Sequence, residues 1–138
     1  MDEVPVPFQA LFDQLRKASP DGSIILPFPV WREAFMNDAP LKIAKESYEK
    51  LSPEPQSSLY TKLDFTKFYE LINTQKLACS YIHSTNDTAL PPGEYNWFPR
   101  FANRLGLCRV VEFAGAGHET PFTNPEGLAE HIIQAGRD

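Results

Sequence analysis

The second half of the chain alternates two short apolar runs with two helical patterns, and this order restricts the fold more than any other feature. Residues 77–83 and 108–113 are compact runs of strand-forming residues bounded by polar ones. An apolar helical stripe between them closes at Gly106, and Asn124-Pro125 is typical of the cap and first turn of a last helix. The order strand, helix, strand, helix predicts an α/β fold with two parallel strands, a crossover helix and a terminal helix.

Prolines divide the first half of the chain into short segments. Eight of the 13 prolines lie between residues 5 and 55, and each one starts or ends a helix or holds an extended segment. The spacing of apolar residues between them predicts a series of short helices. We expect an extended segment over 24–30 and helices over 7–17, 31–36, 40–50 and 64–73.

Length and charge exclude several classes of function. A chain of 138 residues with 42% hydrophobic positions is one domain in size, and its net charge of −5 gives no basic surface for nucleic acid. Its apolar stretches are too short and too often interrupted to cross a membrane, and the N-terminus has no signal-peptide pattern. Cys79 and Cys108 do not make a disulfide framework, so we expect free thiols and a cytoplasmic location.

The three histidines do not form a metal site in the sequence. His83, His118 and His131 share no i, i+4 helix face, and neither cysteine has the spacing of a metal ligand. We therefore expect no metal and no cofactor. His83 and His131 fit structural positions on a strand end and on the flank of the last helix.

Asp87 and His118 each follow one of the two predicted strands, and they are 118 − 87 = 31 residues apart. Parallel strands end at the same edge of a sheet, so the two loops can meet there. A carboxylate that accepts the Nδ1–H of a histidine fixes its tautomer and leaves the other ring nitrogen free to take a proton. Spacing alone leaves two ordinary alternatives open, an aspartate that bonds its own turn and a surface histidine.

Both loops resemble those of the α/β-hydrolase superfamily. The run Asp87-Thr-Ala-Leu-Pro91 is similar to the acid loop of that superfamily, and Gly117-His118 with Asn124-Pro125 is similar to its histidine loop and final helix. The resemblance implies that Asp87 is the acid and His118 the general base of a catalytic triad. Cofactors are not implied.

The first half also resembles part of this superfamily, in its branch of esterases and hydroxynitrile lyases. The stretches 34–38 and 51–55 are similar to the passage from lid to core in that branch. The resemblance implies a partial α/β-hydrolase fold, with a lid-like helical segment over 1–76 and the C-terminal βαβα part over 77–138. Phe28, Trp31 and Phe35 are candidates for lining an apolar substrate cleft under the lid, although aromatic residues in such short segments also serve as packing.

One part of the family pattern is missing from the chain. No G-x-S-x-G pentapeptide occurs, so the serine elbow and the strands that precede the lid are absent from these residues. A two-stranded parallel sheet leaves an apolar edge open, which predicts self-association or a complementing chain at that edge. The resemblance implies an esterase-type hydrolase for a small apolar ester or related carbonyl compound, as in secondary-metabolite pathways. The alternatives are a truncated, non-catalytic binding or assembly partner, and a lyase or cyclase that uses His118 as its base.

Overall fold

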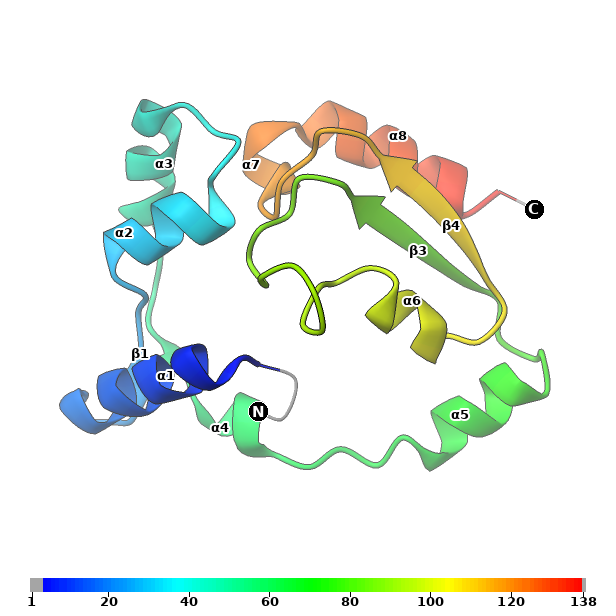
Figure 1. Ribbon diagram of the computed structural model, residues 1–138, viewed down its shortest axis with the longest axis horizontal. Helices are drawn as coiled ribbons and strands as arrows, with labels where there is room; N and C mark the ends of the chain where they lie inside the picture. Colours follow the sequence, from blue (N-terminus) through cyan, green and yellow to red (C-terminus); the bar gives the residue numbers. More distant parts are fainter. Residues whose placement is uncertain (1–3, 138) are drawn as a thin grey trace.

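Prolines precede three of the helices of the first half. The computed structural model describes residues 4–137 (Figure 1). Pro5, Pro27 and Pro40 have extended backbones and stand directly before the first residues of three helices, as expected for a residue that cannot continue a helix toward its own N-terminus. The elements are α1 (Val6–Ala18), β1 (Ser23–Ile24), α2 (Phe28–Val30), the π-helix η1 (Trp31–Phe35), α3 (Leu41–Tyr48), β2 (Glu54–Pro55), α4 (Ser57–Tyr60) and α5 (Thr66–Asn73).

The extended segment expected over 24–30 is correct only at its start. β1 pairs antiparallel with β2, but residues 28–30 form the helix α2, which continues directly into η1. Pro29 lies in the first turn of α2, where its missing N–H has no helical partner to lose. The alternation of prolines and apolar residues therefore marks a helix start here, and the sequence interpretation of 28–30 is wrong.

The buried centre of the first half lies between η1 and α3. Trp31, Met36, Ala39 and Ala44 form one buried cluster, in which Met36 has no exposed surface. The indole Nε1–H of Trp31 donates to the hydroxyl of Ser47 at 3.1 Å, and that hydroxyl donates to the carbonyl of Ala44. Burial of the apolar groups stabilises this part, and the hydrogen bonds fix which face of α3 meets η1.

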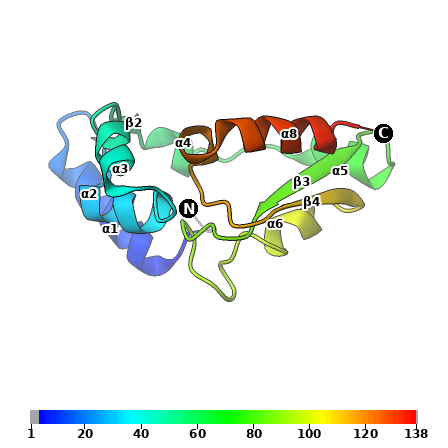
Figure 2. The same ribbon diagram turned by 90° about the horizontal axis from the view of Figure 1, so that it is seen from above.

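The second half is the predicted βαβα unit. Its elements are β3 (Cys79–Ser84), α6 (Arg100–Arg104), β4 (Cys108–Phe113), α7 (Thr120–Thr123) and α8 (Pro125–Ala135). β3 and β4 are parallel, with Cys79 opposite Cys108 and both thiols free. α8 lies on one side of the two strands and α6 on the other (Figure 2). The α/β fold class is confirmed, and so is the left-handed conformation at Gly106, where φ is +65°.

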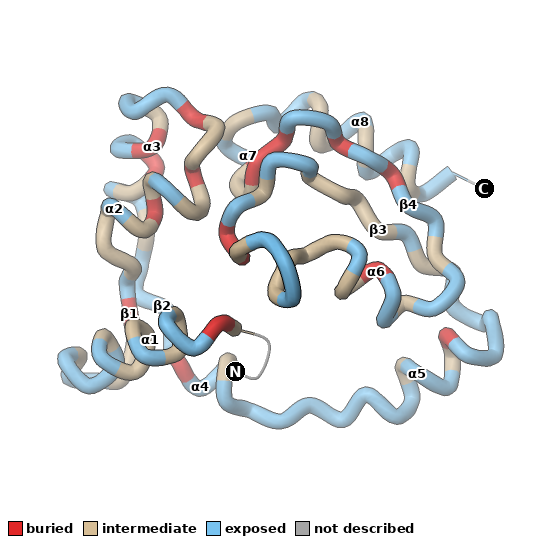
Figure 3. The backbone as a smooth tube through the Cα atoms, in the orientation of Figure 1, coloured by how far each residue is buried: buried red, intermediate tan, exposed pale blue. Residues whose placement is uncertain are grey.

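Exposed residues lie along both halves (Figure 3), and large apolar residues are among them. In the described residues β3 and β4 pair only with each other, so the sheet has two free edges. On β4, Val110 is 46% exposed. In the α5 region, Phe65 and Tyr69 are 49% and 42% exposed. No helix among residues 4–137 has the length and apolar character needed to cross a membrane.

Candidate active site

The loops that follow β3 and β4 are hydrogen-bonded to each other. The backbone N–H of Asn86 donates to the carbonyl of Ala116 at 2.9 Å, and the N–H of Gly115 donates to the hydroxyl of Thr85 at 2.8 Å. These bonds continue the pairing of the strands past their carboxyl ends. As a result the two loops run side by side at one edge of the sheet, where parallel α/β sheets hold their ligands.

His118 and Asp87 form a hydrogen-bonded pair in these loops, which we call the dyad. Nδ1 of His118 lies 2.9 Å from Oδ2 of Asp87. The other carboxylate oxygen, Oδ1, accepts the N–H of Ala89 at 2.9 Å, which holds the carboxylate in a tight turn. With Asp87 accepting at Nδ1, the imidazole keeps Nε2 free as the nitrogen that can take a proton.

Two aromatic rings hold the imidazole of His118 in place. The edge of Phe35 meets it with ring centroids 5.0 Å apart, and Trp97 stacks on it at 5.6 Å. Its side chain is 27% exposed, while that of Asp87 is 14% exposed. Among the described residues 4–137, Nε2 of His118 has no hydrogen-bond partner. Ser84 lines the same surface pocket as His118, but its hydroxyl does not bond to Nε2.

The charges around His118 favour its protonated form. Burial lowers the pKa of His118. The hydrogen bond that its ring donates to Asp87 and the negative charges of Asp87 and Glu119 outweigh burial and raise this pKa above its ordinary value. Burial also raises the pKa of Glu119. The carboxylate of Asp87 therefore stabilises the protonated ring of His118. A general base needs this stabilisation once it has taken a proton.

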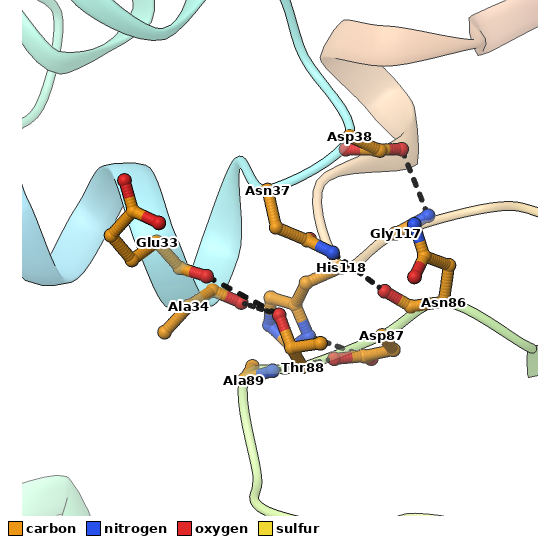
Figure 4. A network of polar contacts seen from close by, with 10 residues as sticks. All are labelled: Glu33, Ala34, Asn37, Asp38, Asn86, Asp87, Thr88, Ala89, Gly117 and His118. Atoms are coloured by element: carbon orange, nitrogen blue, oxygen red, sulfur yellow. Dashed lines mark hydrogen bonds and ion pairs between the residues drawn. The ribbon is translucent and has the colours of Figure 1, made fainter.

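A short segment of the first half fastens both loops of the dyad (Figure 4). We call residues 33–38 the lid turn. The side-chain amide of Asn37 donates to the carbonyl of Asn86 at 2.9 Å, next to Asp87 in sequence. Oδ2 of Asp38 accepts the N–H of Gly117 at 2.9 Å, next to His118. The lid turn thus contacts the backbone beside each dyad residue.

Two more hydrogen bonds join the lid turn to residues near the dyad. The hydroxyl of Thr88 donates to the carbonyl of Ala34 at 3.2 Å, and the hydroxyl of Thr123 donates to Oδ2 of Asp38 at the same distance. At Gly117 a side chain would not fit, because a Cβ there would lie 2.6 Å from the carboxyl of Asp38. Glycine is therefore needed at position 117 because the carboxyl of Asp38 lies so close to its Cα, and not because the backbone there is left-handed.

An apolar cavity of about 290 Å³ is lined by Phe35, which also contacts the ring of His118, although neither dyad residue is in its lining. Trp31 and Phe35, two of the three aromatic residues proposed to line a substrate cleft, are in its wall. Phe28, the third, lies outside this lining and packs edge-on against Tyr48, with ring centroids 5.2 Å apart. Glu119, the residue after His118, also reaches the wall.

The other two histidines have packing contacts. His83 stacks on Phe98 with centroids 4.4 Å apart, and His131 stacks on Phe113 at 4.0 Å. His131 therefore faces the sheet rather than the outer flank of α8. Neither histidine contacts the dyad through a hydrogen bond in the described residues.

Sequence reasoning did not assign a role to Asn37 or Asp38. The stretch that contains them served only as a mark of resemblance, because nothing in its composition shows that it meets loops 49 and 79 residues further along the chain. The one local signal is the glycine before His118, which implies a close neighbour without naming it.

The comparisons with known proteins found one solved structure of high similarity. It is an extracellular α/β-hydrolase from a Paenibacillus species, described as sharing structural and functional homology with tobacco salicylic acid-binding protein 2. The match has a TM-score of 0.91 and 40% sequence identity, and covers 99% of this chain and 55% of that one. The chain thus spans about half the length of this relative. No protein-family model and no curated protein matches the chain.

Proposed function

Because this chain belongs to the α/β-hydrolase superfamily and covers the lid and C-terminal part of that fold, we propose that it carries the acid and base of an esterase-type hydrolase. The observation that supports this most directly is the 2.9 Å contact between His118 Nδ1 and Asp87 Oδ2 at the carboxyl ends of two parallel strands. The substrate class is a small apolar ester or related carbonyl compound, including those of secondary-metabolite pathways.

In this function His118 moves the protons and Asp87 stabilises the charged ring. Nε2 of His118 takes the proton from an attacking hydroxyl as that oxygen bonds to the ester carbonyl, and returns it to the alkoxide that leaves. Asp87 accepts the Nδ1–H throughout and favours the imidazolium. The apolar wall with Trp31 and Phe35 binds the hydrocarbon part of the ester.

The attacking serine comes from outside these residues in our proposal. The chain contains no G-x-S-x-G elbow. We propose that a polypeptide segment carrying this elbow adds a strand to a free edge of the β3–β4 sheet, where unpaired backbone groups offer a template. Without it, the dyad can act only as a general base on water, an effect of about 10²–10⁴-fold.

The experiment is hydrolysis of a short-chain aryl ester, 4-nitrophenyl butyrate, by the chain and by two histidine variants. His118→Ala is expected to abolish turnover, and His131→Gln, which changes a histidine outside the dyad, is expected to keep it. Turnover that survives His118→Ala would exclude the proposed base.

The absence of the serine elbow also favours a second candidate, a non-catalytic binding or assembly partner. A fluorophosphonate probe, applied to the chain together with the segment that carries the serine elbow, separates the two candidates, because stoichiometric serine labelling excludes the binding partner. A lyase or cyclase with His118 as its base is separated from a hydrolase by analysis of the products. The cytoplasmic location stays a prediction from the sequence, and the Paenibacillus relative is described as extracellular.

A further inference from the structure

The apolar cavity of about 290 Å³ that Phe35 lines has a buried amide in its wall. The wall consists mainly of aliphatic and aromatic side chains from α1, β1, η1 and the region of β2 and α4, among them Phe12, Ile24, Leu26, Trp31, Leu51 and Leu59. Gln56 lies in the same wall, and the residue is only 2% exposed.

Among residues 4–137, neither polar atom of the Gln56 side chain has a hydrogen-bond partner. Both Nε2 and Oε1 are buried without a hydrogen bond in the structure. A buried amide without partners destabilises a folded chain, since it has lost water and gained nothing in return. A ligand that brings a donor and an acceptor to this wall removes that penalty, and therefore binds more tightly than one that does not.

The wall also determines the charge of the ligand. Glu54 and Glu119 are the ionisable residues of this wall, and no lysine or arginine among residues 4–137 lines the cavity. An anionic ligand would meet two carboxyl groups and no cation. A neutral group that places a donor beside an acceptor is complementary to the Gln56 amide, and a carboxamide has this arrangement.

We propose that this cavity binds neutral ligands with an apolar body and a carboxamide group, and that Gln56 selects them through paired hydrogen bonds. The inference names the substrate class of the proposed hydrolase and rests on that function for turnover, although binding can be measured without it. The cavity adjoins the dyad, because Phe35 lines its wall and also packs on the ring of His118.

The test is the binding of three probes of similar size, benzamide, benzoate and acetophenone, measured by NMR titration of the labelled chain. Two added hydrogen bonds predict that benzamide binds about tenfold more tightly than the other two. In Gln56→Met, which replaces the unpaired amide by an apolar side chain of similar length, the three affinities are expected to lie within about threefold. Gln134→Met on α8 is the matched control and is expected to keep the preference.

The Gln56→Met variant is expected to melt at or above the temperature of the parent chain, which shows that it folds. The inference is overturned if no probe binds, if benzamide is not preferred, or if the preference persists in Gln56→Met. Turnover of 4-carbamoylphenyl acetate separates this result from the proposed function. With the segment that carries the serine elbow present, preferential binding of benzamide without ester hydrolysis supports the inference and counts against the hydrolase, whereas hydrolysis without the preference does the opposite.

Discussion

Asp38 and Gly117 are 79 residues apart in the chain and in direct contact in the fold, with Oδ2 of Asp38 2.9 Å from the backbone nitrogen of Gly117. This contact joins the lid turn to the residue before the proposed base. Together with the bond from Asn37 to the carbonyl of Asn86, it means that the lid turn contacts both loops of the dyad. The position of His118 relative to Asp87 therefore depends on the first half of the chain as well as on the sheet.

Replacing Gly117 by alanine tests how close this contact is. The added Cβ would lie 2.6 Å from the carboxyl of Asp38, so one of the two segments must move. We expect a loss of about 1–3 kcal/mol in the free energy of unfolding, measured by denaturant titration. Gly136→Ala is the control, because a Cβ there meets atoms no closer than 3.6 Å. Equal stability of the two variants would contradict the close approach.

Removal of the Asp38 carboxyl tests whether the lid turn positions the dyad. Asp38→Ala leaves the N–H of Gly117 and the hydroxyl of Thr123 without their acceptor, and we expect a loss of about 1–3 kcal/mol in unfolding free energy. The positioning role predicts in addition a lower pKa of His118 by NMR, because its bond to Asp87 loosens.

Asp38→Asn keeps one acceptor oxygen and is expected to restore most of both properties. Asp64→Ala serves as a control, since the Asp64 carboxylate is exposed and bonds only within its own turn, to Thr66. If the His118 pKa is the same in Asp38→Ala as in the parent chain, Asp38 contributes to stability alone.

The sequence predicts the second half well because its determinants are local. Strand-forming runs, the glycine at the end of the crossover helix and the Asn124-Pro125 cap act within a few residues, and the parallel order follows from them. The dyad is predicted from the same topology, because loops after neighbouring parallel strands meet at one edge. The short helix α7, placed inside a predicted loop, is the exception.

The features that the sequence did not predict depend on contacts between residues far apart in the chain, which local sequence patterns do not show. Gln56 follows a proline in a polar stretch of the sequence, yet it is 2% exposed in the wall of a cavity that residues of α1, η1 and α4 also line. Phe65 and Tyr69 lie in a segment with a helical pattern, yet residues 4–137 leave both about half exposed. The assignment of 28–30 is wrong because a proline in a first helical turn and one in an extended segment look alike in sequence.

Asp87→Asn is predicted to lower the pKa of His118. The bond and the charge of Asp87 raise that pKa against burial, so without the charge the burial effect dominates and the pKa falls below its ordinary value of 6.5. NMR titration of the imidazole measures this directly. Ester hydrolysis by the parent chain should increase as the pH rises through the raised pKa, since the base must be neutral.

The same shift predicts how stability depends on pH. Because the folded-state pKa of His118 is raised, its contribution to the free energy of unfolding is complete below pH 6.5 and is lost as the pH rises through the folded-state value. In Asp87→Asn this dependence should reverse or vanish. A His118 pKa in Asp87→Asn at or above that of the parent chain would show that the dyad is not an ion pair in solution.

The free edges of the sheet and the exposed apolar groups on β4 predict association of the chain. Val110 of β4 is 46% exposed beside an edge with unpaired backbone groups, a combination that favours pairing with another chain. Sedimentation velocity at increasing concentration should show dimers or larger species, and Val110→Lys should weaken association about tenfold by placing a charge at this surface. Val6→Lys, at a 68% exposed position on α1, is the control and should leave association unchanged. A compact monomer at every concentration that melts in one cooperative step would contradict the prediction. It would mean that the chain buries enough apolar surface without a partner.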